Sequence, residues 1–187
     1  MAYRAPIDEK KLIEDLQNPA TARQAFDTLM RTYGEQIYWQ IRKMVVNHDD
    51  ANDLLQNCFI KTWKNIHNFR GDARLSTWLY KIAVNESINF LNKERQRLGI
   101  TESSDDSFLL QNLESDKYFD GDELQLRLQQ AVAKLPEKQR LVFNMRYYDD
   151  MKYEEMSEIL GTSVGALKAS YHHAVKKISA AIEGSEI

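Results

Sequence analysis

Apolar residues recur along most of the chain at the 3.6-residue spacing of an amphipathic α-helix. In residues 22–46 they follow one helix face, at Ala25, Phe26, Leu29, Tyr33, Ile37, Ile41 and Met44. The same period predicts a second helix over about residues 50–66 and a third over residues 75–95. No stretch alternates apolar and polar residues with a period of two, so the sequence predicts helices and no sheet.

Two interruptions separate these three helices. Residues 48–50 read His-Asp-Asp, and either Asp49 or Asp50 is expected to cap the second helix by accepting its free N–H groups. Residues 68–72 read Asn-Phe-Arg-Gly-Asp, which is typical of a turn. The third helix is expected to follow this turn directly.

The helical period is lost in residues 97–121, which gather Ser, Asp and Glu. Such a segment is expected to be a flexible acidic linker, extended by repulsion between its charges. Apolar residues interrupt it without indicating where they dock: Phe108, Leu109, Leu110, Tyr118 and Phe119.

The period resumes at residue 122 and leads into a helix–turn–helix pattern. Helices are predicted over residues 122–135, 137–148, 153–160 and 164–182, and Pro136 suits a first turn because its missing N–H costs nothing there. Gly161 suits the left-handed conformation that closes a helix, and Thr162 and Ser163 follow as candidate N-caps. The predicted fold is therefore all-α, with two small helical domains joined by the flexible acidic linker and the helix–turn–helix in the second domain.

The last two predicted helices have an inward and an outward face. Inward positions are expected at Met156, Ile159, Leu160, Val164, Leu167, Tyr171, Val175 and Ile178. Outward positions are Gly165, Ala166, Lys168, Ala169, Ser170, His172, His173, Lys176 and Lys177. In DNA-binding motifs of this kind the start of the second helix enters the major groove, where Lys168 would reach a phosphate or a guanine edge. An ordinary helical hairpin with a solvated lysine-rich face is the alternative that this pattern leaves open.

Composition and charge exclude several classes of protein. Hydrophobic residues make up 43% of the chain and charged residues 28%, as in a globular protein. No apolar run approaches the roughly 20 residues of a membrane span, so a cytoplasmic protein is expected. Cys58 is the single cysteine, which excludes an internal disulfide and a cysteine-based metal cluster. His172 and His173 point about 100° apart on a helix and do not converge on one ion. No metal or cofactor is expected.

The net charge of −3 conceals an uneven distribution. Residues 1–95 carry a net charge of +2, residues 96–123 a net of −6 and residues 124–187 a net of +1. Affinity for duplex DNA comes largely from neutralised phosphates. Neither end of the chain is therefore basic enough to bind DNA tightly without help.

Two surfaces of the first 95 residues carry candidate chemistry. The second helix presents Asp53, Gln56, Asn57 and Lys61 around exposed apolar positions, which suits a protein partner. The loop of residues 68–72 offers an aromatic ring, an arginine and a glycine, beside a helix with Lys81, Asn85 and Asn89. Stacking groups and cations of this kind suit single-stranded nucleic acid. Phe69 and Trp78 as plain core residues are the alternative, and we favour it for Trp78.

Three segments together resemble the extracytoplasmic-function (ECF) group of the sigma-70 family. The promoter-melting segment of that group is similar to FRGDARLSTWLYKIAVNESINFLNKERQR, and its segment for binding the polymerase clamp is similar to DDANDLLQNCFIKTWKNI. Its C-terminal promoter-reading domain resembles LPEKQRLVFNMRYYDDMKYEEMSEILGTSVGALKASYHHAVKKI. The resemblance implies an N-terminal domain over residues 1–95, a linker over 96–123 and a C-terminal domain over 124–187.

The resemblance also implies roles for individual residues. Core RNA polymerase, through its β′ clamp, would be bound by Asp53, Leu54, Gln56, Asn57, Phe59, Ile60 and Trp63. The promoter −10 element would be opened and read by Asn68, Phe69, Arg70, Gly71, Asp72, Lys81, Asn85 and Asn89. The −35 element would be read by Ser163, Val164, Gly165, Lys168, Ser170, His172 and Lys176. Further implied partners are the polymerase β flap, along with an anti-sigma factor that holds the chain inactive.

The chain departs from the group pattern at two places. Asn57 stands where the group usually has Glu, and Ala169-Ser170 replaces the more typical Ser-Arg, which removes one cation from the −35 surface.

A free-standing helix–turn–helix regulator would need a sensor site in residues 1–95, and we identify none there. An enzyme would need clustered carboxylates, and Asp49, Asp50 and Asp53 are explained by their place at a helix start. No catalytic activity is therefore expected.

Overall fold

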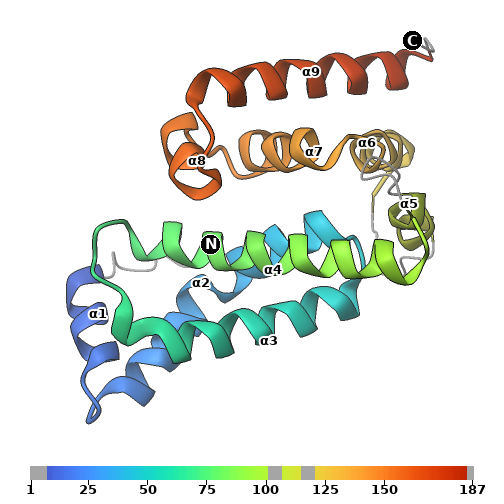
Figure 1. The fold of residues 1–187 in the computed structure, drawn as a ribbon. Helices are drawn as coiled ribbons and strands as arrows, with labels where there is room; N and C mark the ends of the chain where they lie inside the picture. Colours follow the sequence, from blue (N-terminus) through green and yellow to red (C-terminus); the bar gives the residue numbers. More distant parts are fainter. Residues whose placement is uncertain (1–7, 101–106, 115–120, 185–187) are drawn as a thin grey trace.

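The computed structural model describes residues 8–100, 107–114 and 121–184, and every regular element in these ranges is helical (Figure 1). The N-terminal half is built of five elements, which are α1 (Glu9–Gln17), α2 (Ala22–Val45), α3 (His48–Asn65), the 3₁₀ turn η1 (Ile66–Asn68) and α4 (Leu75–Arg97). The C-terminal half contains α6 (Glu123–Ala133), α7 (Glu137–Phe143), the π-helical turn η2 (Asn144–Tyr148), α8 (Tyr153–Leu160) and α9 (Val164–Glu183). The predicted all-α fold with a helix–turn–helix is confirmed.

Helices α2 and α3 meet at a tight junction whose capping residue differs from the prediction. Val46 takes the left-handed conformation at φ 66° and ends α2. The N-cap of α3 is Asn47, whose side-chain oxygen accepts the N–H groups of Asp49 at 2.8 Å and Asp50 at 3.0 Å. The expectation that an aspartate caps this helix is therefore wrong. Both aspartates lie in the first turn, where their charge favours the positive end of the helix dipole.

The core of the N-terminal half lies between α2, α3 and α4, which pack against one another. Its side chains are apolar residues at the predicted helical spacing, among them Leu29, Ile37, Ile41, Cys58, Leu75, Leu79 and Ala83. α1 packs on α2 and η1 and adds Leu12 and Leu16 to the same core. The sequence prediction had placed no helix before residue 22, so α1 is an addition to the predicted fold.

The C-terminal half stacks α6 and α7 against α9, and α8 joins α9 in the helix–turn–helix. A small core here consists of Ala131, Val132, Leu135, Phe143, Ala174 and Ile178. The Phe143 ring stacks on Tyr147 and Tyr171 at centroid distances of 5.0 and 6.0 Å. The predicted inward position at Val175 is wrong, because Val175 is exposed and Ala174 takes the buried place one residue earlier.

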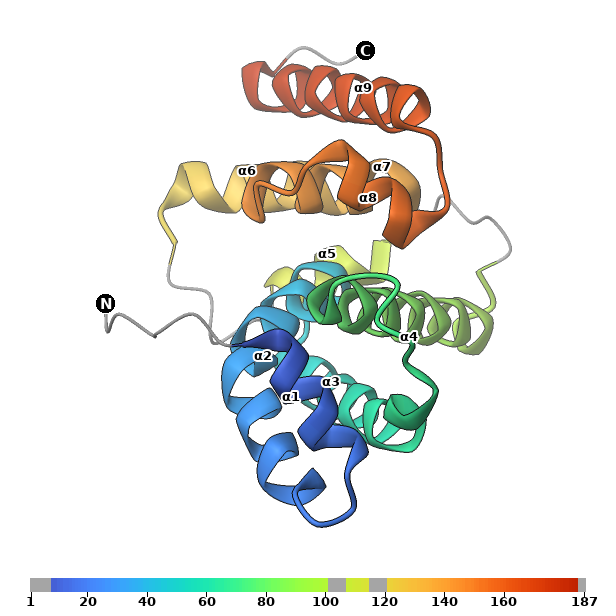
Figure 2. The same cartoon turned by 90° about the vertical axis from the view of Figure 1, so that its left-hand side faces the viewer.

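The two halves pack directly on each other, with α4 in the middle (Figures 1 and 2). The side chain of Asn144 donates to the backbone carbonyl of Lys43 at 3.1 Å, across 101 positions of sequence. This carbonyl lies in the last turn of α2, where no partner is available within the helix. Two ion pairs also cross the junction, Lys43 with Asp149 and Arg95 with Glu137.

Packing between the halves explains the second buried face of α4. Thr77 and Tyr80 line the groove between α4 and the C-terminal half, Arg95 forms its ion pair with Glu137 there, and Val84 is buried as well. Met145, Met151 and Met156 continue the same apolar cluster on the other side of the junction. The sequence left the placement of the two halves relative to each other open, so this face was not expected.

The chain between the halves contains a further helix, α5 (Ser107–Glu114). Phe108, Leu109 and Leu113 are buried, and α5 packs on α6. The expectation of an extended chain is therefore wrong for this segment, because its apolar residues fold into the core. Tyr118 and Phe119 lie outside the described residues.

Candidate nucleic-acid and partner interfaces

The outer face of α3 combines polar and apolar side chains that the protein core leaves uncovered. Asp53, Gln56 and Asn57 are exposed. Ile60 is 51% exposed and Trp63 is 41% exposed, and large apolar side chains exposed side by side often mark an interaction surface. The structure thus brings together five of the seven residues expected to bind polymerase.

Leu54 and Phe59 differ from the other members of this set. Leu54 is only 6% exposed and packs in the core, so its side chain does not face a partner, contrary to the expectation. Phe59 is half-buried, and its ring contacts Phe26 edge-on at 6.1 Å. Phe26 also supports Trp63 at a centroid distance of 5.0 Å. The rings of Phe59 and Trp63 therefore both pack against Phe26.

Cys58 lies on the buried side of the same helix. Burial raises the pKa of its thiol from 9.0 to about 12, and the nearby carboxylate of Glu86 acts in the same direction. Glu86 itself forms an ion pair with Lys61 and so ties α4 to α3. A thiol in this setting stays protonated, which fits a packing role.

Residues 69–74 form an exposed loop between η1 and α4. Asn68, Arg70, Gly71 and Asp72 are exposed, and Gly71 has a φ of 75°, which a residue with a side chain rarely adopts. Phe69 is half-buried, and its ring lies 5.0 Å from that of Trp78. The loop residues expected to read the −10 element are therefore together on the surface, while Phe69 and Trp78 also contribute to packing.

The loop is fastened at both ends by α1. Gln17 donates from its side-chain nitrogen to the carbonyls of Phe69 at 2.8 Å and Ile66 at 3.1 Å. At the other end, a carboxylate oxygen of Glu9 accepts the N–H of Leu75, the first residue of α4. Sequence reasoning missed both residues, because nothing in a nine-residue helix indicates which distant carbonyl it will meet.

Beyond the loop, α4 presents one polar face to solvent. Lys81, Asn85 and Asn89 are exposed and stand four residues apart, so they lie along one side of the helix. This face lies on the helix that directly follows the loop. The opposite sides of α4 are buried in the core and against the C-terminal half.

The helix–turn–helix has the predicted local geometry. Gly161 closes α8 at φ 62°, and Ser163 is the N-cap of α9, with its hydroxyl accepting the N–H of Ala166 at 3.3 Å. Members of the expected −35 set that are exposed are Ser163, Gly165, Lys168, His172 and Lys176, whereas Val164 and Ser170 are half-buried. α9 lies on the far side of α6 and α7 from the N-terminal half (Figure 1).

Tyr153 at the start of α8 supports two cations near this surface. The ammonium of Lys168 lies 5.7 Å from the centre of its ring, and the guanidinium of Arg146 also lies 5.7 Å from it. Contacts of this kind are worth about 0.5–1 kcal/mol at exposed sites. They hold Lys168 near the first turn of α9, where a major-groove contact would be made.

A groove of about 570 Å³ between the halves has an acidic lining. The loop and α4 side contributes Asp72, Arg74 and Tyr80, and the other side is formed by Asp149, Asp150, Lys152, Glu154, Glu155 and Glu158. Burial raises the pKa of the Asp149 carboxyl, and Lys43 opposes this shift. Among the described residues no three His, Cys, Asp or Glu side chains are placed to hold a metal ion. Within the same residues, no helix is long and apolar enough to cross a membrane.

Two family profiles match the two halves of the chain. The description "Sigma-70 region 2" matches residues 29–97, and "Sigma-70, region 4" matches residues 125–178. The chain is 30% identical over 156 residues to the ECF RNA polymerase sigma factor SigW of Bacillus subtilis, covering 79% of this chain and 83% of SigW. It is 28% identical over 183 residues to the RNA polymerase sigma-H factor of Pseudomonas aeruginosa, covering 94% of both chains.

Solved structures share the fold at lower identity. CnrH in complex with the cytosolic domain of CnrY has a TM-score of 0.69 and 20% identity, covering 95% of this chain and 99% of that chain. The sigma factor RpoE of Bartonella quintana, in complex with the anti-sigma factor NepR, has a TM-score of 0.66 and 19% identity, covering 86% of this chain and 98% of that chain.

These matches identify the chain as a member of the sigma-70 family, in its ECF group of RNA polymerase sigma factors. It is therefore a transcription initiation factor that directs RNA polymerase to promoters. The alternative of a free-standing helix–turn–helix regulator is not favoured, because the first half matches a sigma region as well.

Proposed function

We propose that the three exposed surfaces divide the work of promoter recognition among the parts of the chain. The N-terminal domain, residues 1–95, binds core RNA polymerase and opens the −10 element. Residues 96–123 connect it to the C-terminal domain, residues 124–187, which reads the −35 element. The observation that carries this assignment is the outer face of α3, where Ile60 and Trp63 stay exposed beside polar side chains.

The α3 face is the proposed contact with the β′ clamp. Interfaces of this kind bury a few aromatic anchors, surrounded by polar groups that exclude water. Trp63 and Ile60 supply the anchors, and Asp53, Gln56 and Asn57 supply the polar surroundings. Leu54 acts from below by holding α3 in place, since its side chain is buried.

The loop and the exposed face of α4 form the proposed −10 surface. A base that leaves the duplex needs a pocket with a stacking or polar partner and a nearby cation for the backbone. Asn68 ends η1, and Phe69, Arg70, Gly71 and Asp72 follow it in the loop. The duplex edge would lie along α4, next to the exposed side chains of Lys81, Asn85 and Asn89.

The start of α9 is the proposed −35 surface. A recognition helix places its first turns in the major groove, and Gly165 leaves room for the DNA backbone. Lys168 provides the central cation, with Ser163, Val164 and Ser170 near it and His172 and Lys176 farther along the helix. The C-terminal domain also makes the proposed contact with the β flap.

An anti-sigma factor is the proposed regulator, since the structural neighbour RpoE was solved with the anti-sigma factor NepR. The chain acts in the cytoplasm, where polymerase and chromosome are found. It catalyses no reaction of its own, because its task is to bind and position DNA for the polymerase.

The experiment combines core polymerase binding with run-off transcription from randomised promoters. The wild-type chain is expected to bind polymerase and to select one promoter sequence. Lys168→Ala should weaken selection at the −35 element and leave polymerase binding unchanged, whereas Arg70→Ala should impair opening of the selected promoter. Failure of the wild-type chain to bind polymerase, or equal loss of binding and selection in Lys168→Ala, contradicts the assignment.

A further inference from the structure

One short helix controls both ends of the proposed base-reading loop. α1 (Glu9–Gln17) precedes residue 29, where the match to sigma-70 region 2 begins. Its last residue, Gln17, donates hydrogen bonds to the carbonyls of Ile66, just before the loop, and Phe69, the first loop residue. Its first residue, Glu9, is bonded to the N–H of Leu75 after the loop. The length of α1 therefore spans the distance between the two ends of the loop.

The bond from Glu9 compensates for a weak helix start. Arg74 stands at the N-cap of α4 and makes no capping hydrogen bond with its side chain. A cation is also poorly placed there, because the N-terminus of a helix carries partial positive charge. Glu9 brings a carboxylate to this end and accepts one of the N–H groups that lack a partner within the helix. The start of α4 is thus capped from α1.

The bonds from Gln17 fix the other end at two carbonyls at once. The Ile66 carbonyl also accepts the N–H of Phe69 at 3.1 Å, so a single amide group holds the whole turn of η1. Between the two anchors, residues 70–74 are exposed, and Gly71 adds backbone freedom at its positive φ. The shape of the loop therefore depends on the positions of its ends.

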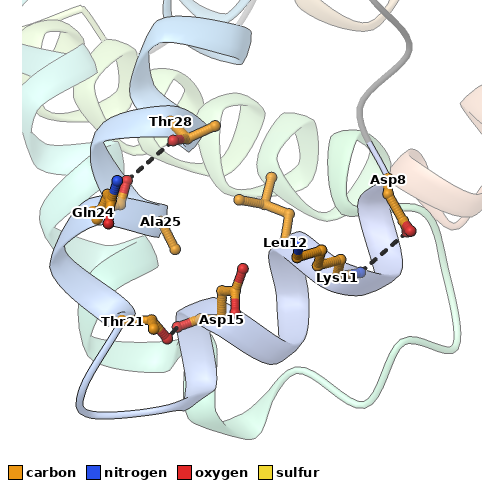
Figure 3. Close-up of a pocket in the computed structure, with 8 residues that line it drawn as sticks. All are labelled: Asp8, Lys11, Leu12, Asp15, Thr21, Gln24, Ala25 and Thr28. Carbon is orange, nitrogen blue, oxygen red and sulfur yellow. Dashed lines mark hydrogen bonds between the residues drawn. The ribbon is translucent and has the colours of Figure 1, made fainter.

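α1 is itself held firmly. Leu12 and Leu16 are buried in the core, and the hydroxyl of Thr21 donates to the carbonyl of Asp15 at 2.8 Å to close the turn into α2. From this turn α1 and α2 diverge, with a groove of about 390 Å³ between them (Figure 3). The residues that line the groove include Gln24, on the opposite wall from α1.

We propose that α1 is the positioning element of the base-reading loop and that Gln17 and Glu9 are its positioning residues. By fixing both ends, they hold the loop in the form that receives a flipped base. The conformational entropy of the loop is then lost when the chain folds, and not when DNA binds. This inference rests on the proposed role of the loop in opening the −10 element. It adds a determinant of opening outside the part of the chain that matches region 2.

The test measures promoter opening in the complete complex of full-length chain, core polymerase and the selected promoter, with 2-aminopurine in the −10 element. Gln17→Met keeps the side-chain length but removes the donor, and about tenfold slower opening is expected. Gln17→Glu keeps the shape but turns a carboxylate toward two carbonyl oxygens, so opening should be slower still. Gln24→Met makes the same chemical change at an exposed position away from the loop and should open within twofold of the wild type.

Polymerase affinity and formation of the closed promoter complex are measured on the same variants and should not change. A role limited to packing predicts that Gln17→Glu, with the same shape, opens as fast as the wild type, and that result overturns the inference. Arg70→Ala separates this failure from failure of the proposed function. If Arg70→Ala impairs opening and Gln17→Met does not, α1 has no positioning role. If Arg70→Ala opens normally, the loop itself is wrongly assigned.

Discussion

The exposed ring of Trp63 leads to a quantitative prediction about polymerase binding. An aromatic side chain of this size presents up to about 250 Å², so a side chain that is 41% exposed leaves about 100 Å² for a partner to cover. At about 25 cal/mol per Å², this area is worth about 2.5 kcal/mol. Because about 1.4 kcal/mol corresponds to a tenfold change in affinity, Trp63→Ala should weaken binding by up to about 70-fold.

The measured loss is expected to lie between about 10-fold and 70-fold, since ordering of side chains at the interface offsets part of the gain. Fluorescence anisotropy of N-terminally labelled full-length chain, titrated with core polymerase, gives the dissociation constant. Circular dichroism melts check that the variant stays folded, because the Trp63 ring also contacts Phe26.

Trp39→Ala is the matched control for this measurement. Trp39 is 52% exposed but lies on α2, beside the groove formed with Lys43, Tyr148 and Asp149. The same Trp-to-Ala change there should alter polymerase affinity by less than about threefold, since no interface is assigned to it. Equal losses for the two variants, or a loss below about threefold for Trp63→Ala, would refute the area argument.

Three further predictions concern stability and reactivity. Leu109→Ala should lower the free energy of unfolding by about 2–5 kcal/mol in urea titration, because this α5 side chain is fully buried; a loss below about 1 kcal/mol would exclude α5 from the core. Asn144→Ala removes a hydrogen bond between the halves worth about 1 kcal/mol, so amide exchange in the facing parts of α2 and η2 should accelerate about fivefold while α3 stays unchanged. An equal acceleration of amide exchange in all helices would contradict this prediction. The pKa of Cys58 rises from 9.0 to about 12 on folding, so at pH 8 its thiolate fraction and its alkylation rate by iodoacetamide should be about 1,000-fold lower in the folded chain than in urea. Comparable rates in both states would show that the thiol is accessible.

The long helices could be predicted because each buries one continuous stripe. Residues such as Leu29, Ile37 and Ile41 repeat at helical spacing over more than three turns, and the structure places them in one core. The turn chemistry of Gly161 and Ser163 was equally local, and both residues have the expected geometry. Features of this kind depend only on residues that are close in sequence, so the sequence alone predicts them.

The features that were missed depend on contacts between distant segments. α1 buries only Leu12 and Leu16, which is too few positions to establish a period. Phe108 and Leu109 stand among acidic residues, and only the core that receives them reveals a helix. The burial of Tyr80 and Val84 requires knowledge of the C-terminal half. The polymerase contact of Leu54 was implied by the resemblance alone, and the structure buries this side chain.

The candidate site was predicted as a set of surfaces rather than as a geometry. Resemblance placed Arg70 and Lys168 in the segments that meet DNA in related proteins, and both are exposed. It gave no indication of how the loop is held, because Gln17 and Glu9 act across about 50 and 66 positions of sequence. Tertiary packing decides which residues support a surface, and helical periodicity does not predict them.

The packing of the two halves has a consequence for the size of the working complex. A folded chain of 187 residues has a radius of gyration of about 16 Å, or a width of about 40 Å. Elements centred at −35 and −10 lie about 25 base pairs apart, which is about 85 Å along duplex DNA at about 3.4 Å per base pair. The arrangement in which Asn144 holds the end of α2 is therefore too short to reach both elements at once. If each half reads one element, as proposed, binding both elements at once requires this junction to come apart, and the free energy that closes the junction is then subtracted from the affinity of the chain for the polymerase on DNA.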